Sequence, residues 1–564
     1  MSKFNEKNLG VQPTEINEMG EMAFKLSEKE ELVSTVMTTF LQDAYYENES
    51  EVTKRILALI DKVDPLFAAK LAIYARNDGK LRSVTHLIAA YIAHMISGQE
   101  WGKRFYNKIV IRPDDISEIV ACYAALNGQD QKNISKIPNS IKKGFKEALE
   151  RFDAYQIDKY KMERRNISMV DLVNIFHPHG TQKNAEAYRR LMKGESLKDL
   201  YDSKILEKEM SEAGQKTKGM SEAEKNEAKK QAIREVLNGI KGMPYMNLIR
   251  NLRNIMIYAP GSVAEACRQL TIEQKVLNSR LLPFRFATAY AEIEKMRFSD
   301  VKSESSTTGI AFESDVLNGI CDEAEFNNNK KKVLNALEDA LQIACQNIPK
   351  LEGNVAILVD HSGSVRGDGG GHSRVSAFSA TTRAMIGNLF GSMVAYRQDN
   401  VYFGLFGDRL INVPIDRNKK MLDFNRESYD LGAKCGGATE TGIYDFLRMV
   451  VKEKKKIDNV VVFSDCQIGT ADTKSWRGGF TPWYGSDYGD RGEHFHELFK
   501  QFRKINPNAN FIVCNVNQTK GTSVFDRSQR ILNIAGWSEK IFDIISSQCK
   551  GWDAMIKEIE AIEI

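Results

Sequence analysis

Apolar positions recur with two different periods along the chain. From about residue 18 to 347 they follow mostly helical spacing, in segments separated by short breaks. Asp64 and Pro65 end one such helix and begin another, as its N-cap and first helical residue, and Gly79 closes the second before a third over about 83–96. The pattern predicts short antiparallel helices stacked in pairs, because each helix needs neighbours to bury its apolar face.

After Pro349 the pattern changes to short apolar runs rich in Val, Ile and Phe, which alternate with helical stretches. These runs are 354–359, 401–406, 459–463 and 510–516. Continuous apolar runs are typical of strands buried on both faces in a parallel sheet covered by helices. We therefore expect an α-helical domain over residues 1–349 and a doubly wound, Rossmann-like α/β domain over 350–564, with ligands bound beyond the carboxyl ends of the strands.

The composition is that of a globular protein with more than one domain. The 564 residues exceed what one hydrophobic core supports, and hydrophobic residues make up 42% and charged residues 27%. The eight cysteines show no CxxC spacing, and the N-terminus has no apolar signal sequence, so a reducing cytoplasm is expected. No apolar run reaches the roughly 18 residues of a membrane span.

Positive charge is concentrated in one segment. The whole chain carries a net charge of only +4, yet residues 132–165 hold ten Lys or Arg against five acids. The rest of the chain is therefore slightly acidic. A clustered basic surface binds a phosphate backbone better than dispersed charges, because it neutralises several phosphates and releases their counterions. A solvated helix face is the alternative interpretation.

Short polar motifs follow two of the predicted strands. Asp-His-Ser-Gly-Ser (360–364) follows the first strand and Ser-Asp (464–465) the third, while Gly-Gly-Ala-Thr (436–439) lies in a loop between them. Carboxylate and hydroxyl oxygens that converge at strand ends suit a hard divalent cation, Mg²⁺ or a similar ion. The candidate ligands are Asp360, Ser362, Ser364, Thr439 and Asp465.

This set resembles the metal-ion-dependent adhesion site of von Willebrand factor A domains. That resemblance implies an ion that keeps one coordination position for an acidic residue of a partner. Taken alone, the first motif is also compatible with a polar turn that caps a helix. Two inserts flank the predicted site, 366–374 with four glycines and 476–492 with Gly, Trp, Tyr and Asp. Each is compatible with a functional loop or with a merely mobile one.

The order of these parts resembles the TROVE-domain or Ro autoantigen family, in its bacterial type. The resemblance rests on Ile-Lys-Lys-Gly-Phe (141–145), Lys-Tyr-Lys-Met-Glu-Arg-Arg-Asn (159–166), Asp-Leu (171–172) before Phe-His-Pro (176–178), and Met-Pro-Tyr-Met-Asn-Leu-Ile-Arg-Asn-Leu (243–252). It implies a ring of HEAT-like helical repeats (TROVE) followed by a von Willebrand factor A domain.

The resemblance also implies an RNA ligand. In the family, small noncoding Y RNAs lie on the outer surface, and single-stranded 3′ ends of misfolded RNAs enter the central hole. Basic groups would hold phosphates, and a histidine would contact a base or the backbone. For the histidine, a local role at a helix end is the alternative. The RNA-contact residues carried over are Lys142, Lys143, Lys159, Arg164, Arg165 and His177.

No enzymatic activity is expected. The sequence shows neither a nucleophile with a base, nor a two-metal carboxylate cluster, nor a GxxxxGK[ST] phosphate loop. The closely spaced pairs His177/His179 and His494/His496 lack the further ligands of a zinc site. We therefore expect a monomeric, cytoplasmic RNA-binding protein that assists surveillance or decay of defective RNA, with an exoribonuclease as a further partner. The alternative is a Mg²⁺-dependent protein-interaction scaffold with no RNA ligand.

Overall fold

The structure, a computed structural model, divides the chain into two compact units. One unit joins Met1–Leu197 with Pro349–Ile564, and the other is Lys198–Ile348. The predicted boundary near residue 350 coincides with one junction between the units, while the second junction falls inside the predicted helical domain. The described residues are 13–17, 21–39, 49–131, 134, 136–163, 165–201, 231, 240–279, 281, 283–299, 322–348, 350–367, 382–437, 442–465, 468, 471–472, 492–516, 522–525, 530–535 and 554–564.

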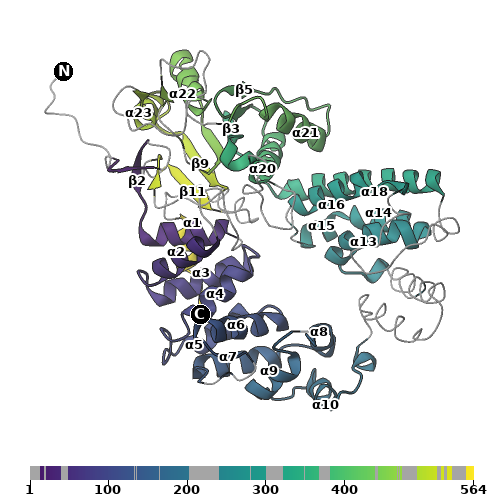
Figure 1. Cartoon of the computed structure of the whole chain (residues 1–564). Helices are drawn as coiled ribbons and strands as arrows, with labels where there is room; N and C mark the ends of the chain where they lie inside the picture. The colour runs from purple at the N-terminus through teal and green to yellow at the C-terminus, as the bar shows by residue number, and fades with distance from the viewer. Residues whose placement is uncertain are drawn as a thin grey trace. The chain divides into compact units, whose positions relative to one another are not determined.

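Short helices build the N-terminal part of the first unit (Figure 1). They start where the sequence predicts a cap: the Asp64 side chain accepts a hydrogen bond from the Leu66 backbone N–H at 3.0 Å, and Pro65 is the first helical residue. The helices pack in neighbouring pairs, α3 on α4, α4 on α6 and α5 on α7. They are α1 (Glu28–Thr38), α2 (Glu49–Ile60), α3 (Pro65–Asn77), α4 (Ser83–Tyr91), α5 (Gly102–Ile109), α6 (Pro113–Leu126), α7 (Asn139–Glu150), α8 (Ala154–Lys159), α9 (Met169–Phe176) and α10 (Ala185–Lys193).

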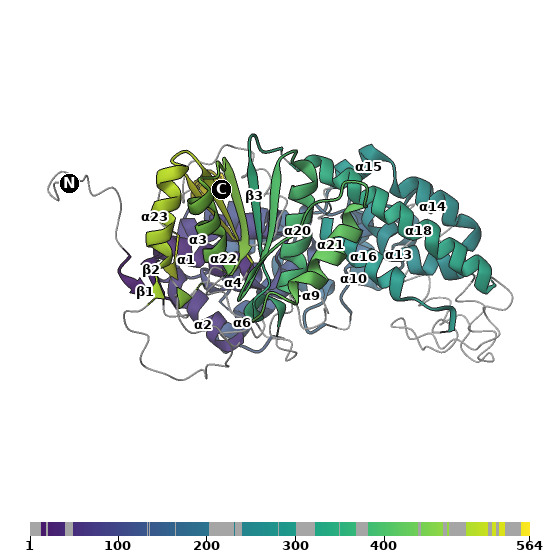
Figure 2. The same ribbon diagram turned by 90° about the horizontal axis from the view of Figure 1, so that it is seen from above.

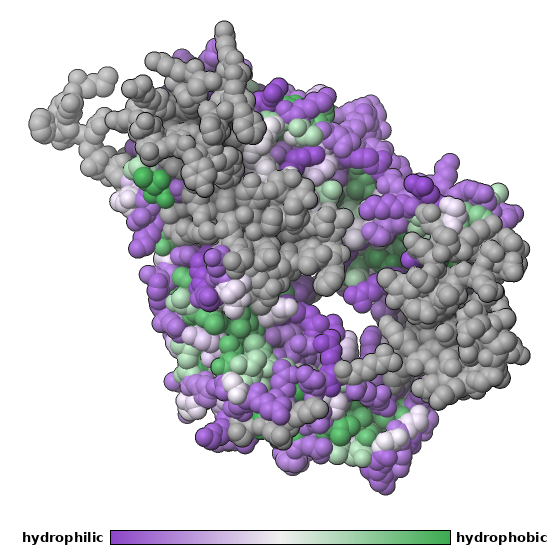
Figure 3. All heavy atoms as spheres, in the orientation of Figure 1, coloured by the Kyte–Doolittle hydropathy of each residue, from purple (hydrophilic) through white to green (hydrophobic). Residues whose placement is uncertain are grey.

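Each of these helices buries one face against its neighbours. The core of the repeats contains large buried rings, and Tyr106 of α5 meets Phe145 of α7 edge-on with ring centroids 5.3 Å apart. Hydrophilic side chains cover most of the visible helical surface, with smaller apolar patches between them (Figure 3). The helices therefore stack through their apolar faces, as the amphipathic spacing of the sequence predicts.

The C-terminal part of the first unit is a six-stranded sheet in the order β11-β9-β6-β3-β4-β5. All neighbouring strands are parallel except β4 and β5. The continuous apolar runs are buried because α20 and α21 cover one face and α22 and α23 the other (Figure 2). The elements are β3 (Val355–Asp360), β4 (Val401–Phe406), β5 (Leu410–Asn412), β6 (Asn459–Ser464), β9 (Asn510–Asn515), β11 (Ile531–Ala535), α20 (Arg383–Arg397), α21 (Met421–Gly432), α22 (Gly442–Glu453) and α23 (Phe495–Ile505).

Both ends of the described chain connect these two parts. Strand β2 (Met22–Lys25) pairs with β1 (Glu15–Ile16) and with β10 (Thr522–Ser523), and α1 packs on the edge strand β11. Helix α25 (Ala554–Glu560) packs on α3, where Lys70 Nζ donates to the Glu560 carbonyl at 2.5 Å. The helical repeats and the sheet therefore form one compact unit.

The second unit is a separate helical bundle. Its long helix α18 (Glu323–Ala344) packs against α13 (Tyr245–Tyr258), α14 (Val263–Leu270), α15 (Glu273–Ser279) and α16 (Pro283–Lys295). The structure thus confirms the predicted fold class, stacked helices together with an α/β domain. None of the described helices combines the length and apolarity needed to cross a membrane.

Candidate functional site

Three of the predicted metal ligands lie together at the carboxyl end of β3. Asp360 is the last residue of that strand, and its Oδ1 accepts the backbone N–H of Ser362 at 2.8 Å. The hydroxyls of Ser362 and Ser364 are 3.1 Å apart, and Ser464 Oγ donates to Asp360 Oδ2 at 2.6 Å. All four side chains are buried. The turn therefore holds several oxygen donors in a fixed arrangement.

A second carboxylate is buried beside the first. Asp465 directly follows β6, the strand next to β3, and is fully buried. Burial and the neighbouring Asp465 charge raise the pKa of Asp360. The buried Arg383 also feels Asp465: burial lowers the pKa of Arg383 to about 10, against the influence of this carboxylate. Two buried carboxylates and two hydroxyls are a donor set that fits a hard cation such as Mg²⁺.

The loop that carries Thr439 reaches the same turn. Thr439 itself lies outside the described residues, but Gly363 N–H donates to the Gly437 carbonyl at 2.7 Å. Gly436 has φ +91°, and a Cβ at this position would overlap the Asp408 carboxylate. A glycine is therefore required for the loop to run this close to β4.

A cation at the rim of this turn was not anticipated from the sequence. Arg366 ends the short helix α19 (Gly363–Arg366), and its guanidinium carbon lies 4.1 Å from the centre of the Tyr429 ring. It donates to His361 Nδ1 at 2.9 Å, while His361 Nε2 faces Asn388 Oδ1 at 3.2 Å. Burial and the Arg366 charge lower the pKa of His361 to about 3, so this histidine is neutral. Apart from Arg366, Gly367 and Gly492, both predicted inserts lie outside the described residues.

In the part of the chain that the structure describes, histidines of the two predicted pairs have other contacts. No group of three or more His, Cys, Asp or Glu there could hold a metal ion. His494 instead faces the buried Glu21, with Nδ1 3.1 Å from Oε1. His179 Nε2 accepts a hydrogen bond from Lys146 at 2.8 Å.

The predicted RNA-contact residues fall into two classes. Lys142 and Lys143 are exposed on α7, and among the described residues neither has an ion pair or a side-chain hydrogen bond. Lys159 ends α8 with its ammonium 5.5 Å from the Tyr155 ring centre, and no described carboxylate pairs with it. These three lysines therefore keep their charges available.

Other cations of the basic segment already have partners. Arg165 lies 3.5 Å from Glu118, and Lys161 lies 2.9 Å from the buried Asp158. Arg151 donates to two carbonyls near the end of α5, Asn107 and Val110, both at 2.8 Å. Arg164 lies outside the described residues. The raw count of ten cations thus overstates what this surface offers to a ligand.

His177 is an exposed residue with an unusual backbone. It follows the last residue of α9 and adopts the left-handed conformation, φ 46° and ψ 61°, which is uncommon for a residue with a side chain. The loop after it is fixed to the end of α7, because His179 N–H donates to Glu150 at 2.9 Å and the buried Asn184 donates to the Glu150 carbonyl at 3.0 Å. Lys146 and His179 therefore join the candidate surface, although the sequence alone did not assign them.

Part of the chain matches a known protein domain. Residues 22–238 match the TROVE domain. Over this region the chain is similar to the TROVE-domain family. Members of this family are generally RNA-binding components of ribonucleoproteins and are not known as enzymes.

Curated proteins and a solved structure are also similar to parts of this chain. Telomerase protein component 1 of Mus musculus is 22% identical over 351 residues, 50% of this chain and 13% of that protein. The Rattus norvegicus protein of the same name is 26% identical over 105 residues, 19% of this chain and 4% of that protein. The chain thus spans a small part of these relatives. The crystal structure of Deinococcus radiodurans RO (RSR) protein has a similar fold, with a TM-score of 0.55, 14% identity and coverage of 93% of this chain and 100% of that chain.

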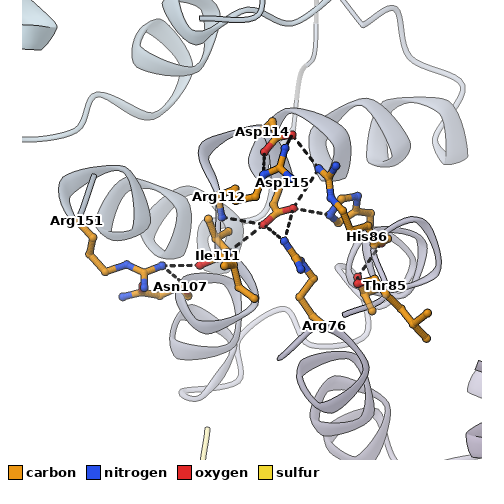
Figure 4. A network of polar contacts seen from close by, with 12 residues as sticks. Arg76, Thr85, His86, Asn107, Ile111, Arg112, Asp114, Asp115 and Arg151 are labelled. Carbon is orange, nitrogen blue, oxygen red and sulfur yellow. Dashed lines mark hydrogen bonds and ion pairs between the residues drawn. The ribbon is translucent and has the colours of Figure 1, made fainter. Parts of the chain in front are cut away.

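The TROVE domain also contains a buried charge network that connects α3, α4 and α6 (Figure 4). Asp115 is fully buried and accepts hydrogen bonds from Arg76 at 2.8 and 3.0 Å. Its other donors are Arg82 at 3.4 Å, His86 Nε2 at 3.0 Å and the backbone N–H groups of Ile111 and Arg112 at 3.0 and 2.9 Å. Burial alone would raise the pKa of Asp115, but the His86 hydrogen bond and the Arg76 charge lower it well below its usual range.

Next to it, Asp114 joins the network to the surface of the TROVE domain. Arg82 and Arg112 both donate to Asp114, at 2.9 Å from Arg82 and 2.9 and 2.5 Å from Arg112. Arg112 in turn lies over the Tyr160 ring, with 4.8 Å between its guanidinium carbon and the ring centre. This network ends in an arginine whose position is fixed by two hydrogen bonds.

Proposed function

We propose that this chain is an RNA-binding protein of the Ro type whose basic helical surface holds a small structured noncoding RNA. The observation that carries the proposal is the set of three lysines, Lys142, Lys143 and Lys159, that have no carboxylate partner among the described residues. Phosphates are the anions that such cations bind with the release of counterions. His177, Lys146 and His179 extend the proposed surface along the end of α9 and α7.

The arrangement of charges in the same helices favours this interpretation over a merely solvated face. Buried Asp115 and half-buried Asp114 already pair with arginines, so their charges are balanced within the repeats. We infer that RNA completes the charge balance that the protein leaves open on this surface. We further propose single-stranded 3′ ends of misfolded RNA as a second ligand, presentation of such RNA to an exoribonuclease, and a role without catalysis of its own.

The test begins with the ligand that the protein carries. The full chain is purified from its host without nuclease, and the copurifying RNA is sequenced. We expect a discrete small RNA, and binding that weakens steeply as salt rises. The variant Lys142→Gln/Lys143→Gln should lose this RNA, whereas Lys452→Gln/Lys500→Gln, which removes two exposed lysines of the α/β domain, should keep it. Retention of no RNA by the parent, together with equal affinity of both variants for structured RNA, would refute the proposal.

We also propose that the turn after β3 binds Mg²⁺ or another divalent cation, with Asp360, Ser362, Ser364, Thr439 and Asp465 as candidate ligands. The buried pair Asp360 and Asp465 supports this, because a divalent cation would relieve the repulsion between two carboxylates taken out of water. When bound, the ion would offer a coordination position to an acidic partner residue. A scaffold that uses only this site, with no RNA ligand, is the competing function.

Direct metal titration tests the site. Isothermal titration of the full chain with Mg²⁺, or electron paramagnetic resonance with Mn²⁺, should detect one site that Asp360→Ala abolishes. Asp445→Ala removes an exposed carboxylate from α22 and should leave the binding unchanged. Loss of RNA affinity in Asp360→Ala without loss of folding would show that the two sites are coupled. Unchanged metal binding in Asp360→Ala would exclude this site.

A further inference from the structure

Two tyrosines and two cations of the helical repeats contact one another in alternation. The Lys159 ammonium lies 5.5 Å from the centre of the Tyr155 ring and 5.9 Å from that of Tyr160. On Tyr160 a second cation is present, because the Arg112 guanidinium carbon lies 4.8 Å from the same ring centre. Both rings are half-buried, so each has an edge or face toward solvent.

We propose that Tyr155, Lys159, Tyr160 and Arg112 form a stacking site for an unpaired RNA nucleotide. The inference rests on the proposed function, RNA binding. It specifies the part of the RNA that binds at this cluster, namely a base that is not paired in an RNA duplex. An aromatic ring and a guanidinium plane both stack on bases of any sequence, and an adjacent lysine pairs with the phosphate of the stacked nucleotide.

Arg112 and Lys159 differ in their hydrogen-bond partners, and this difference indicates a separate role for each. Arg112 donates to Asp114 through two nitrogens, and Asp114 also accepts from Arg82. The Arg112 charge is therefore already neutralised and its plane is fixed, which suits a stacking surface prepared before binding. It follows that Arg112 is not the phosphate contact.

Lys159 has fewer polar contacts among the described residues than Arg112 has. Its one hydrogen-bond partner among the described residues is the Tyr155 hydroxyl at 3.5 Å, a long contact, and no described carboxylate pairs with it. An exposed contact between an ammonium and a ring is weaker than the stacking of a base on that ring. A nucleotide would therefore displace Lys159 from the rings and pair with it through the phosphate.

The backbone around the cluster supports a functional role. Tyr160 follows α8, and a tight turn comes next, in which Met162 has φ +55° and Arg165 N–H donates to the Met162 carbonyl at 2.9 Å. Of the five described non-glycine residues with positive φ, two lie in the basic segment 132–165, Lys136 and Met162, and a third, His177, lies shortly after it. Strained backbone persists where the surrounding structure enforces it, and it concentrates at binding sites.

The test uses a single-stranded oligouridine that carries one 2-aminopurine, and an RNA duplex of equal length. Binding to the parent protein should quench the 2-aminopurine fluorescence. In Tyr160→Leu and Tyr155→Leu the quenching should disappear and the single-strand affinity should fall about 5- to 150-fold, as expected for loss of one stacked base. Duplex affinity and its salt dependence should stay as in the parent. Tyr160→Phe, which keeps the ring, is the matched control and should bind and quench normally.

The outcomes separate this inference from the proposed function. If Lys142→Gln/Lys143→Gln weakens duplex binding while the leucine variants bind and quench like the parent, the stacking site is wrong and the RNA-binding proposal stands. If the parent binds neither RNA, the RNA-binding proposal itself fails. Equal losses for duplex and single strand in Tyr160→Leu would assign the tyrosine a structural role, and this too would overturn the inference.

Discussion

Two charged regions of the same helical repeats are built in opposite ways. Around Asp115 the charges are buried and matched, with two arginines, a histidine and two backbone N–H groups directed at one carboxylate. On the surface of α7 and at the end of α8, three lysines have no described carboxylate partner. The first arrangement holds helices together, and the second leaves charge for a ligand. Both regions contain basic residues, and they differ in whether each charge has a described partner of opposite sign.

The largest effect is expected from breaking the buried region. Asp115→Ala leaves Arg76, His86 and two backbone donors buried without their acceptor, so the free energy of unfolding should fall by about 3–5 kcal/mol. Urea denaturation followed by circular dichroism measures this. Glu186→Gln is the control, because Glu186 pairs with Arg189 and Arg190 on an exposed helix and such pairs contribute about 0–1 kcal/mol. A loss below about 1 kcal/mol for Asp115→Ala would mean that the network does not support the fold.

Acid should weaken the same network. The pKa of Asp115 is lower in the folded protein than in the unfolded chain, so the unfolded state binds the proton more readily. The stability that Asp115 contributes is therefore fully present above its unfolded pKa, about 3.9, and is lost progressively as the pH falls below that value. Urea denaturation between pH 5 and 2, taken as approximate limits of this transition, should show a smaller loss of stability in Asp115→Asn than in the parent. Parallel pH profiles of the two proteins would contradict this assignment.

On the surface the effect should appear in binding and not in folding. Lys142→Gln/Lys143→Gln should lower the dependence of log affinity on log salt concentration by about 1.4–1.8, since each of the two lost phosphate contacts removes about 0.7–0.9. The free energy of unfolding should stay within about 0.5 kcal/mol, as for other exposed positions. Filter binding at several salt concentrations and urea denaturation measure the two quantities. If the variant instead had a lower free energy of unfolding and an unchanged salt dependence of RNA affinity, these lysines would support the fold, as the buried network does, and the two regions would not differ.

Helices and strands could be predicted from the sequence more fully than the ion pairs between their side chains. Asp64 and Pro65 begin a helix as the capping pattern predicts, and the apolar run 354–359 becomes the buried strand β3. The polar residues Asp360 and Asp465 come together because β3 and β6 are neighbours, which follows from the parallel topology. Local patterns and strand order are encoded within short stretches of chain, so they can be read directly.

Contacts between distant residues have no such local signal. Asp114 and Asp115 read as ordinary acids at a helix start, yet one of them is the fully buried centre of a network with Arg76. Arg366 lies in a Gly-rich insert and gives no sequence sign that it stacks on Tyr429. The division of the helical half at residues 197 and 198 also depends on packing that periodicity does not show.

The smallest effect is expected at Arg165, which the sequence predicts to contact RNA. This residue tests whether an existing ion pair reduces the contribution of a cation to RNA binding. Arg165 lies 3.5 Å from Glu118, and both side chains are well exposed. Its charge is already partly balanced, so Arg165→Gln should weaken RNA binding less than Lys142→Gln, with a change in salt slope clearly below the 0.7–0.9 of a full phosphate contact. Glu118→Gln should act in the opposite direction and strengthen binding, because it frees Arg165 for a phosphate. If Arg165→Gln and Lys142→Gln weaken binding equally, pairing does not decide which cations serve the RNA, and the position along the surface does.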